Sequence, residues 1–203
     1  MLESIQHLCL KLKPGREPGF LAIFHKGVYL RSRAGLPLSE VLEAAGFSRK
    51  YLEEKVQTVF LDGSAVDDLD CAIVEDGSVI ALSAAMPGLA GAILRKGSPI
   101  LALRSRTSQV MVPHRTDDTM HALRLKLFNT IANEMGPGLL HSGILVKRQD
   151  LEDFLSNRRK LLEDAVLEAE LDGVPLPVLE LPGGKSISST YIVLQIISPA
   201  TSV

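Results

Sequence analysis

Two Asp-Gly pairs in the first half of the chain restrict its fold more than any other feature. In "VQTVFLDGSAV" (56–66), successive side chains ahead of Asp62-Gly63 alternate between two faces, which is the period of a half-buried strand. Asp-Gly is a favoured pair for a two-residue hairpin turn. A second pair, Asp76-Gly77, precedes the apolar run "SVIALSA" (78–84), which indicates another strand. We therefore expect a sheet of short strands joined by tight turns.

The flanking residues extend this pattern to a β-β-β-α-β-β order over residues 5–91. "HLCLKLKP" (7–14) alternates leucines with Cys and Lys, so it is expected to be a half-buried strand. "FLAIFHKGVYLRS" (20–32) predicts a hairpin in which Gly27 supplies the positive φ of the turn. "LPLSEVLEAAGF" (36–47) has the apolar spacing of a short amphipathic helix that ends at Gly46.

The composition shifts at "LRKGSP" (94–99), and we place a domain boundary at about 92–98. The chain is thus predicted to be an α+β protein, with a first domain over residues 1–94 and a second α/β or α+β domain over residues 95–203. The second domain is expected to have two main helices.

Five segments of the second domain carry secondary-structure signals. One or two strands are expected near 100–113, with Arg104 and Arg106 on a shared face. "TDDTMHALRLKLFNTIANEMG" (116–136) is expected to be a helix capped by Thr116, stopped by Gly136 and buried through Met120, Leu123, Leu127 and Ile131. A short strand at 137–148, the longest helix at 150–173 capped by Asp150, and a closing hairpin around residues 182–185 complete the expectation.

Composition and charge exclude several classes of function. A net charge of −2 and the absence of Trp argue against nucleic-acid binding, which relies on a basic surface and on aromatic stacking. The longest uncharged run, residues 79–94, is shorter than a membrane span and is broken by Pro87, Gly88 and Gly91. The N-terminal residues lack the apolar core of a secretory signal. We therefore expect a cytoplasmic protein in which Cys9 and Cys71 are reduced, buried thiols.

Two segments resemble ligand motifs. "GGKS" (183–186) lacks the earlier glycine of a phosphate-binding P-loop and is followed by a β-branched run, so a hairpin turn is favoured. If a helix began at Pro113, then His114, Asp117, Asp118 and His121 would share one face that could bind a divalent ion. The favoured interpretation is that Thr116 caps the helix, which leaves His114 outside it and makes the two acids ordinary first-turn residues. We assign no metal and no cofactor.

No arrangement in the sequence supports nucleophilic catalysis, and no catalytic residue is assigned. There is no G-x-S-x-G motif, and neither cysteine has a neighbouring His or Lys to lower its pKa. Acidic neighbours are expected to raise the pKa of Cys71. The acidic residues around it do not match a calcium loop and are expected to form a solvated loop face; they are Asp67, Asp68, Asp70, Glu75 and Asp76.

The segment from Val59 to Gly91 carries a resemblance to a known family. The Asp62-Gly63 turn, the following Val66, the Asp76-Gly77 turn, the apolar strand at 79–82 and the small-residue tail "PGLAG" (87–91) occur in that order. In this the first 91 residues resemble β-grasp, ubiquitin-like sulfur carriers, the group of the molybdopterin synthase small subunit and the thiamine-biosynthesis sulfur carrier. The resemblance implies a β-grasp fold. Those carriers end in a Gly-Gly carboxylate that is adenylated and thiolated, whereas this chain continues to residue 203, so carrier chemistry is not expected.

Two functions follow as hypotheses. The first is a non-catalytic binding or scaffold component, in which Met86, Pro87 and Leu89 contact a protein partner or a second copy of the chain. The second is an enzyme, or a binder of a small anionic ligand or a metal ion, with its site between the two halves. Its polar residues would be Arg104, Arg106, His114, His121 and Lys185.

Overall fold

The computed structural model describes residues 5–84, 88–98, 119–183 and 187–198, and it shows an α+β protein. Its contacts divide the chain into two compact units. Unit 1 contains residues 1–29 and 132–203, and unit 2 contains residues 30–131. The domain boundary expected between residues 94 and 95 falls inside unit 2. Whether residues 1–94 and 95–203 fold as separate domains stays a prediction.

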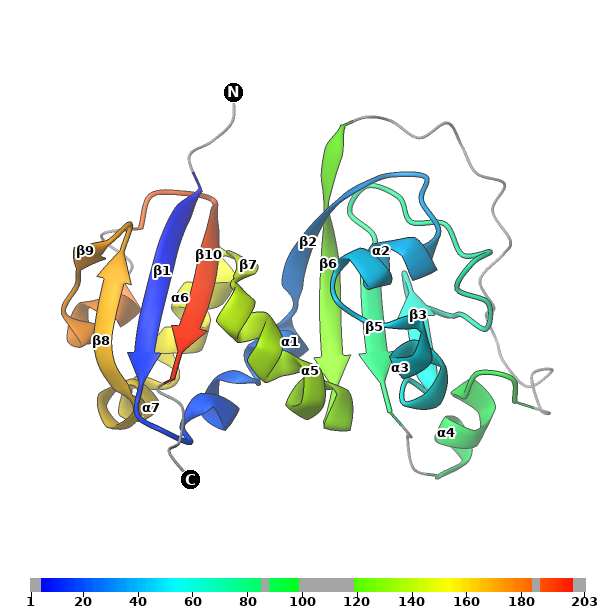
Figure 1. Cartoon of the computed structure of the whole chain (residues 1–203), viewed down its shortest axis with the longest axis horizontal. Helices are drawn as coiled ribbons and strands as arrows, with labels where there is room; N and C mark the ends of the chain where they lie inside the picture. The colour runs from blue at the N-terminus through cyan, green and yellow to red at the C-terminus, as the bar shows by residue number, and fades with distance from the viewer. Residues whose placement is uncertain (1–4, 85–87, 99–118, 184–186, 199–203) are drawn as a thin grey trace. The chain divides into compact units, whose positions relative to one another are not determined.

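Unit 1 is built on a sheet with the strand order β9-β8-β1-β10-β7 (Figure 1). Strand β1 lies inside this sheet, parallel to β10 and antiparallel to β8. Leu8, Leu10 and Leu12 of β1 are fully buried, which confirms the alternation expected at 7–14. The strands are β1 (Gln6–Leu12), β7 (Ile144–Lys147), β8 (Val166–Leu171), β9 (Val174–Pro175) and β10 (Tyr191–Ile197). The helices that contribute residues to unit 1 are η1 (Glu17–Phe20), α1 (Ile23–Lys26), α5 (Asn129–Ser142), α6 (Arg148–Ser156), α7 (Arg159–Ala165) and η3 (Val178–Gly183).

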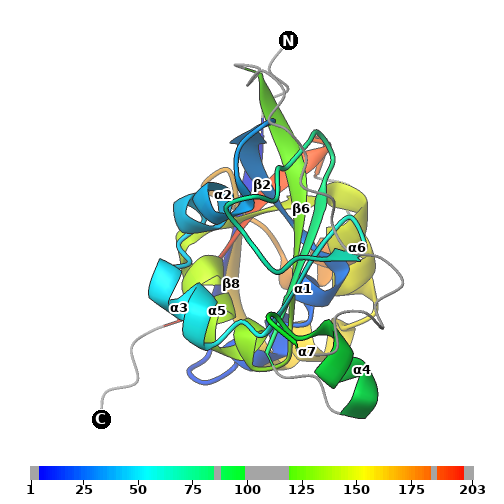
Figure 2. The ribbon, with the colours of Figure 1, turned by 90° about the vertical axis from the view of Figure 1, so that its right-hand side faces the viewer.

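Unit 2 has the strand order β4-β3-β5-β6-β2, in which β5 and β6 are parallel and β3 is antiparallel to both of its neighbours. Its strands are β2 (Val28–Arg33), which begins in unit 1, β3 (Thr58–Leu61), β4 (Ser64–Ala65), β5 (Val79–Ser83) and β6 (Met120–Phe128). Its helices are α2 (Leu38–Ala44), α3 (Arg49–Glu54) and α4 (Gly88–Leu94). Figure 2 shows α2 and α3 together on one side of the strands.

Local signals predicted the centre of unit 2 correctly. Asp62 and Gly63 have φ values of 51° and 78°, so both adopt the left-handed conformation of the hairpin turn between β3 and β4. Helix α2 ends before Gly46, whose φ is 94°, as expected for a glycine that terminates a helix. The strand expected after Gly77 is β5.

The hairpin expected at 20–32 is wrong in its first half, because η1 and α1 replace its first strand. Phe20, Ile23 and Phe24 are fully buried, and their spacing of three and four residues places them on one helical face. Gly27 does adopt a positive φ of 114°, but it ends α1 instead of turning a hairpin. The second half of the segment is β2.

The helix expected at 116–136 is wrong over residues 120–128, whereas residues 129–136 are helical as expected and Ile131 is buried. Residues 120–128 form β6, in which Leu123, Leu125 and Leu127 are fully buried and alternate with charged residues. Met120, expected to be buried, is 48% exposed. Asn129, with a φ of 54°, marks the change from β6 to α5. The helix therefore begins after the alternating segment, not before it.

Gly136 does not stop α5, which continues through Pro137 to Ser142. A Cβ atom at Gly136 would lie 2.6 Å from Leu21 Cδ2 and 3.0 Å from Phe24 Cε2. The glycine therefore permits close packing of α5 against the segment that carries η1 and α1. The strand expected at 137–148 is restricted to β7, because α5 occupies its first residues.

The long helix expected at 150–173 is divided into α6, α7 and β8. Lys147 precedes the first helical residue, so Asp150 lies in the first turn and is not the N-cap. The end of the segment alternates like a strand, since Ala169 and Leu171 of β8 are buried and Glu170 between them is exposed. The expected longest helix is consequently shorter than α5.

The closing hairpin expected around residues 182–185 does not form between the strands that the structure describes. Strand β10 pairs with β1 and β7, while β9 pairs with β8. Asp172 and Gly173, with φ values of 53° and 77°, form the turn between β8 and β9. The hairpin signal in this part of the chain was therefore the Asp-Gly pair at 172–173. Residues 184–186 of the "GGKS" segment lie outside the described residues.

Candidate functional site

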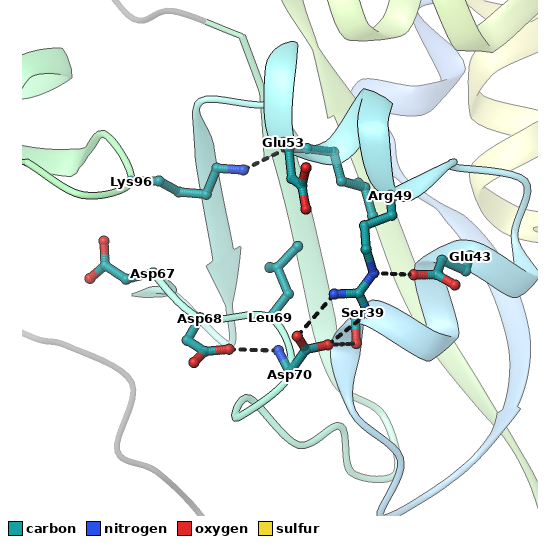
Figure 3. Close-up of a pocket in the computed structure, with 10 residues that line it drawn as sticks. Ser39, Glu43, Arg49, Glu53, Asp67, Asp68, Leu69, Asp70 and Lys96 are labelled. Carbon is teal, nitrogen blue, oxygen red and sulfur yellow. Dashed lines mark hydrogen bonds and ion pairs between the residues drawn. The ribbon is translucent and has the colours of Figure 1, made fainter.

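A surface pocket of about 290 Å³ lies in unit 2, between α2, α3, the loop at 67–70 and the turn after α4 (Figure 3). Main-chain hydrogen bonds fasten this loop to the start of α2. Leu38 N donates to Ala72 O at 2.8 Å, and Ser39 N donates to Leu69 O at 3.1 Å. The residues that line the pocket are Ser39, Glu43, Arg49, Leu52, Glu53, Asp67, Asp68, Leu69, Asp70 and Lys96.

Arg49 is held in the pocket by two carboxylates. Its Nη1 and Nη2 atoms each lie 3.0 Å from one oxygen of Asp70, and its Nε donates to Glu43 at 3.0 Å. Such a bidentate contact fixes the orientation of a guanidinium. Ser48 caps α3 by accepting a hydrogen bond from Tyr51 N, which places Arg49 at the first helical residue. The carboxylates raise the pKa of Arg49 well above its usual range.

Asp70 accepts hydrogen bonds from Arg49 and from Ser39, whose Oγ lies 2.5 Å from Asp70 Oδ1. These contacts lower the pKa of Asp70 to about 2, so its carboxylate remains charged under all physiological conditions. A carboxylate with so low a pKa is a weak base and does not activate the Ser39 hydroxyl as a nucleophile. The arrangement fixes charge and does not transfer a proton.

Asp68 organises the loop that carries Asp70. Its Oδ1 accepts hydrogen bonds from Asp70 N at 2.9 Å and from Cys71 N at 3.2 Å. The hydrogen bond from the Cys71 thiol and these main-chain contacts lower the pKa of Asp68. The same contact raises the pKa of Cys71, as the acidic neighbours had suggested.

The expectation of two buried thiols is wrong, because Cys71 is exposed and Cys9 is partly exposed. Cys71 lies on the loop between β4 and β5, whereas Cys9 occupies an alternating position of β1. Both are free cysteines. Burial and the nearby Glu170 carboxylate raise the pKa of Cys9.

Lys96 forms the opposite wall of the pocket, and three hydrogen bonds place it there. Lys96 N donates to Gln57 O at 2.8 Å, Lys96 Nζ donates to Leu52 O at 2.6 Å, and Gly97 N donates to Asp67 Oδ1 at 3.0 Å. Burial lowers the pKa of Lys96, and the Glu53 carboxylate opposes this effect only in part. Figure 3 shows the amine directed toward the end of α3.

The described lining of the pocket is predominantly acidic. Five carboxylates face two basic side chains, which gives a formal charge of −3. Within this lining we find no pairing of a nucleophile with an effective base. Across the described ranges, no group of three His, Cys, Asp or Glu side chains is arranged to hold a metal ion. The geometry is suited to binding a positively charged group.

The candidate residues from the sequence do not gather at this pocket in the part of the chain that is described. His121 lies on β6, where its Nδ1 is 3.0 Å from Asp76 Oδ1. Leu89 belongs to α4, and its side chain is outside the description. The other candidates lie outside the described residues and stay predictions; they are Met86, Pro87, Arg104, Arg106, His114 and Lys185, together with Asp117 and Asp118 of the possible metal face.

Sequence reasoning missed most of the pocket. The sequence predicts a solvated loop face at Asp67, Asp68 and Asp70, and these residues are indeed partly or largely exposed, but each also accepts a specific hydrogen bond. Arg49 and Lys96 gave no signal, because their pocket partners are brought to them by tertiary contacts. The Ser48 cap was a local signal for the start of α3.

Comparison of the chain with protein-family models, with curated proteins and with solved structures finds no match. Among the described helices, none has the length and apolar character needed to cross a bilayer. The geometry and charge of the pocket are therefore the features that point to a function.

Proposed function

We propose that this protein is a non-catalytic binding component whose pocket in unit 2 receives a Lys or Arg side chain of a partner protein. The observation that carries the proposal is the formal charge of −3 on a pocket whose Ser39, Arg49 and Asp70 are fixed by one another. This proposal retains the interaction role expected from the sequence and assigns it to different residues.

Charge favours a basic group over the anionic ligand considered from the sequence. The guanidinium of Arg49 is already occupied by Asp70 and Glu43, so it is poorly placed to receive a second anion. Asp70 remains ionised because its pKa is about 2. An entering anion would therefore meet a net negative surface, whereas a cation would be attracted by it.

Size and lining favour a side chain over a cofactor. A volume of about 290 Å³ lies at the lower limit of small-molecule pockets, which typically span about 300–1,000 Å³. Leu52 and Leu69 supply apolar surface among the charged residues. A long basic side chain matches both properties, because its methylene stem packs on apolar atoms while its charged end reaches carboxylates.

We also propose that unit 2 carries the β-grasp-like module, which the resemblance implied for the first 91 residues. Support comes from the order β2, α2, α3, β3, β4 and β5 along the chain and from the tight turn between β3 and β4. The expected contribution of β1 differs, since β1 pairs with β8 and β10 of unit 1. The parallel neighbour of β5 is instead β6, which follows it in sequence.

Binding of a fluorescent hexalysine peptide, followed by anisotropy, tests the proposal. Glu53→Gln removes one pocket charge and is expected to weaken binding about threefold or more, as for loss of a close, partly screened charge contact. Glu54→Gln is the matched control, because Glu54 is the next residue of α3 and does not line the pocket. Its effect should be clearly smaller. Equal effects of the two variants, or no binding by the unaltered protein, would contradict the proposal.

A further inference from the structure

We infer that Lys96 is a tethered cation that occupies the pocket until a partner's basic group displaces it. This inference rests on the proposed function, and it adds a mechanism of regulation to the same site. It follows from the position of Lys96, from the contacts that its ammonium makes and from the contrast with Arg49.

The turn after α4 carries Lys96 into the pocket. Arg95 N donates to Gly91 O at 3.1 Å, and Ser98 N donates to Arg95 O at 3.2 Å, so the turn continues directly from the helix. Lys96 N is bonded to Gln57 O, just ahead of β3, and Gly97 N is bonded to Asp67. The main chain therefore delivers the ammonium to the pocket independently of any ion pair.

The ammonium of Lys96 is incompletely matched to its surroundings. An ammonium has three hydrogen-bond donors, and among the described residues its Nζ donates to one acceptor, Leu52 O. Although five carboxylates line the pocket, Lys96 forms no ion pair with any described carboxylate. Burial lowers its pKa more than the Glu53 carboxylate raises it, so the hydrogen bond to Leu52 O and the nearby charge do not fully replace the lost hydration. Release of this ammonium to water breaks one described hydrogen bond and restores its hydration.

Arg49 provides the contrast within the same pocket. Its guanidinium is fixed by three hydrogen bonds to Asp70 and Glu43, which raise its pKa. One cation of the pocket is therefore locked into place, and the other is replaceable. The acceptor that Lys96 would vacate, Leu52 O, belongs to the last turn of α3, where the orientation of carbonyl groups favours a cation.

A partner's ammonium or guanidinium can thus take the position of the Lys96 ammonium on Leu52 O while approaching the surrounding carboxylates. Without the lysine charge, the formal charge of the pocket changes from −3 to −4. Occupation by Lys96 lowers the affinity for basic groups, and its displacement releases the turn at 95–98 from one of its anchors. Lys96 therefore acts as an autoinhibitory contact.

The test measures hexalysine binding to the full-length protein by fluorescence anisotropy. Lys96→Met removes the internal competitor and is expected to increase affinity about five- to tenfold. Lys50→Met is the matched control, since it makes the same charge change on α3, where the Lys50 side chain is 81% exposed and does not line the pocket. It should change affinity less than about twofold, as expected for an exposed charge.

Lys96→Gln provides a second variant that removes the charge but keeps a hydrogen-bond donor for Leu52 O, and circular dichroism checks that each variant is folded. Tighter binding by either folded Lys96 variant, beyond that of Lys50→Met, supports the inference. Affinity equal to or below that of Lys50→Met overturns it, as does unfolding of both Lys96 variants, which would make the contact structural. If Glu53→Gln still weakens binding in that case, the proposed function stands. If the unaltered protein does not bind hexalysine, the proposed function itself fails.

Discussion

The two units both contain a parallel pair of strands inside their sheet, but they use polar side chains differently. In unit 1, Gln6 of β1 holds the loop before β10 together, and its Oε1 accepts hydrogen bonds from the main-chain N–H groups of Ser188 and Ser189. In unit 2, Arg49 and Asp70 gather around an open pocket. The polar contacts of Gln6 thus join segments of the fold in unit 1, whereas those of unit 2 surround the pocket that we propose as a binding site.

The largest effect on stability is expected from packing in unit 1. Gly136→Ala introduces a Cβ atom 2.6 Å from Leu21 Cδ2, so it should lower the free energy of unfolding by about 1–2 kcal/mol after the gain in helix propensity. Gly138→Ala is the control, because no atom lies within 4 Å of its added Cβ; it should stabilise α5 by up to about 1 kcal/mol. Urea denaturation measures both. A Gly136→Ala variant whose free energy of unfolding equals or exceeds that of the unaltered protein would contradict close packing at this position.

A smaller effect is expected from the polar contacts of β1. Gln6→Ala removes the shared acceptor of Ser188 and Ser189, and it should lower the free energy of unfolding by about 1 kcal/mol. Gln195→Ala on β10 removes a single described hydrogen bond, from Nε2 to His141 O at 2.9 Å. Gln195→Ala should lower the free energy of unfolding by about half as much as Gln6→Ala, because one exposed hydrogen bond contributes at the lower end of the usual range. Equal losses would show that Gln6 has no special role in closing the sheet.

The smallest effect is expected from the pH dependence of unit 2. The pKa of Asp70 is lowered from 3.8 to about 2, so its ion pair contributes stability above pH 4, and this contribution is lost as the pH falls from about 4 to about 2. Asp70→Asn should therefore be less stable than the unaltered protein at pH 7, and the difference should shrink toward pH 2. Thermal unfolding at several pH values measures this. A difference that does not vary with pH would mean that the carboxylate charge is unimportant.

Sequence reasoning succeeded where the decisive residues are neighbours. Asp62-Gly63 determines the turn between β3 and β4 through its own backbone preferences, and Gly46 ends α2 in the same way. It failed at β6, because Leu123 and Leu127 fit both a helix and a strand. The intervening Leu125 supplied the strand period, but the decisive contact is the parallel pairing with β5, between residues far apart in sequence.

The pocket could not be predicted for the same physical reason. Arg49, Asp70 and Lys96 come from separate segments, and no local sequence pattern shows that they line one pocket. The sequence did indicate an acidic loop and a less reactive Cys71, since both depend on nearby residues. The prediction lacked the orientation of these side chains and the pairing of strands that are distant in sequence.

The pairing of β1 with β10 has a consequence for the order in which the protein is made. These strands occupy Gln6–Leu12 and Tyr191–Ile197, near opposite ends of the chain, yet they are hydrogen-bonded neighbours. A nascent chain emerging from the ribosome therefore exposes one edge of β1 until Tyr191–Ile197 have been synthesised, and closure of so long a loop is slow. All residues of unit 2 precede Ala132 in the chain, so its internal contacts can form before β10 has been synthesised.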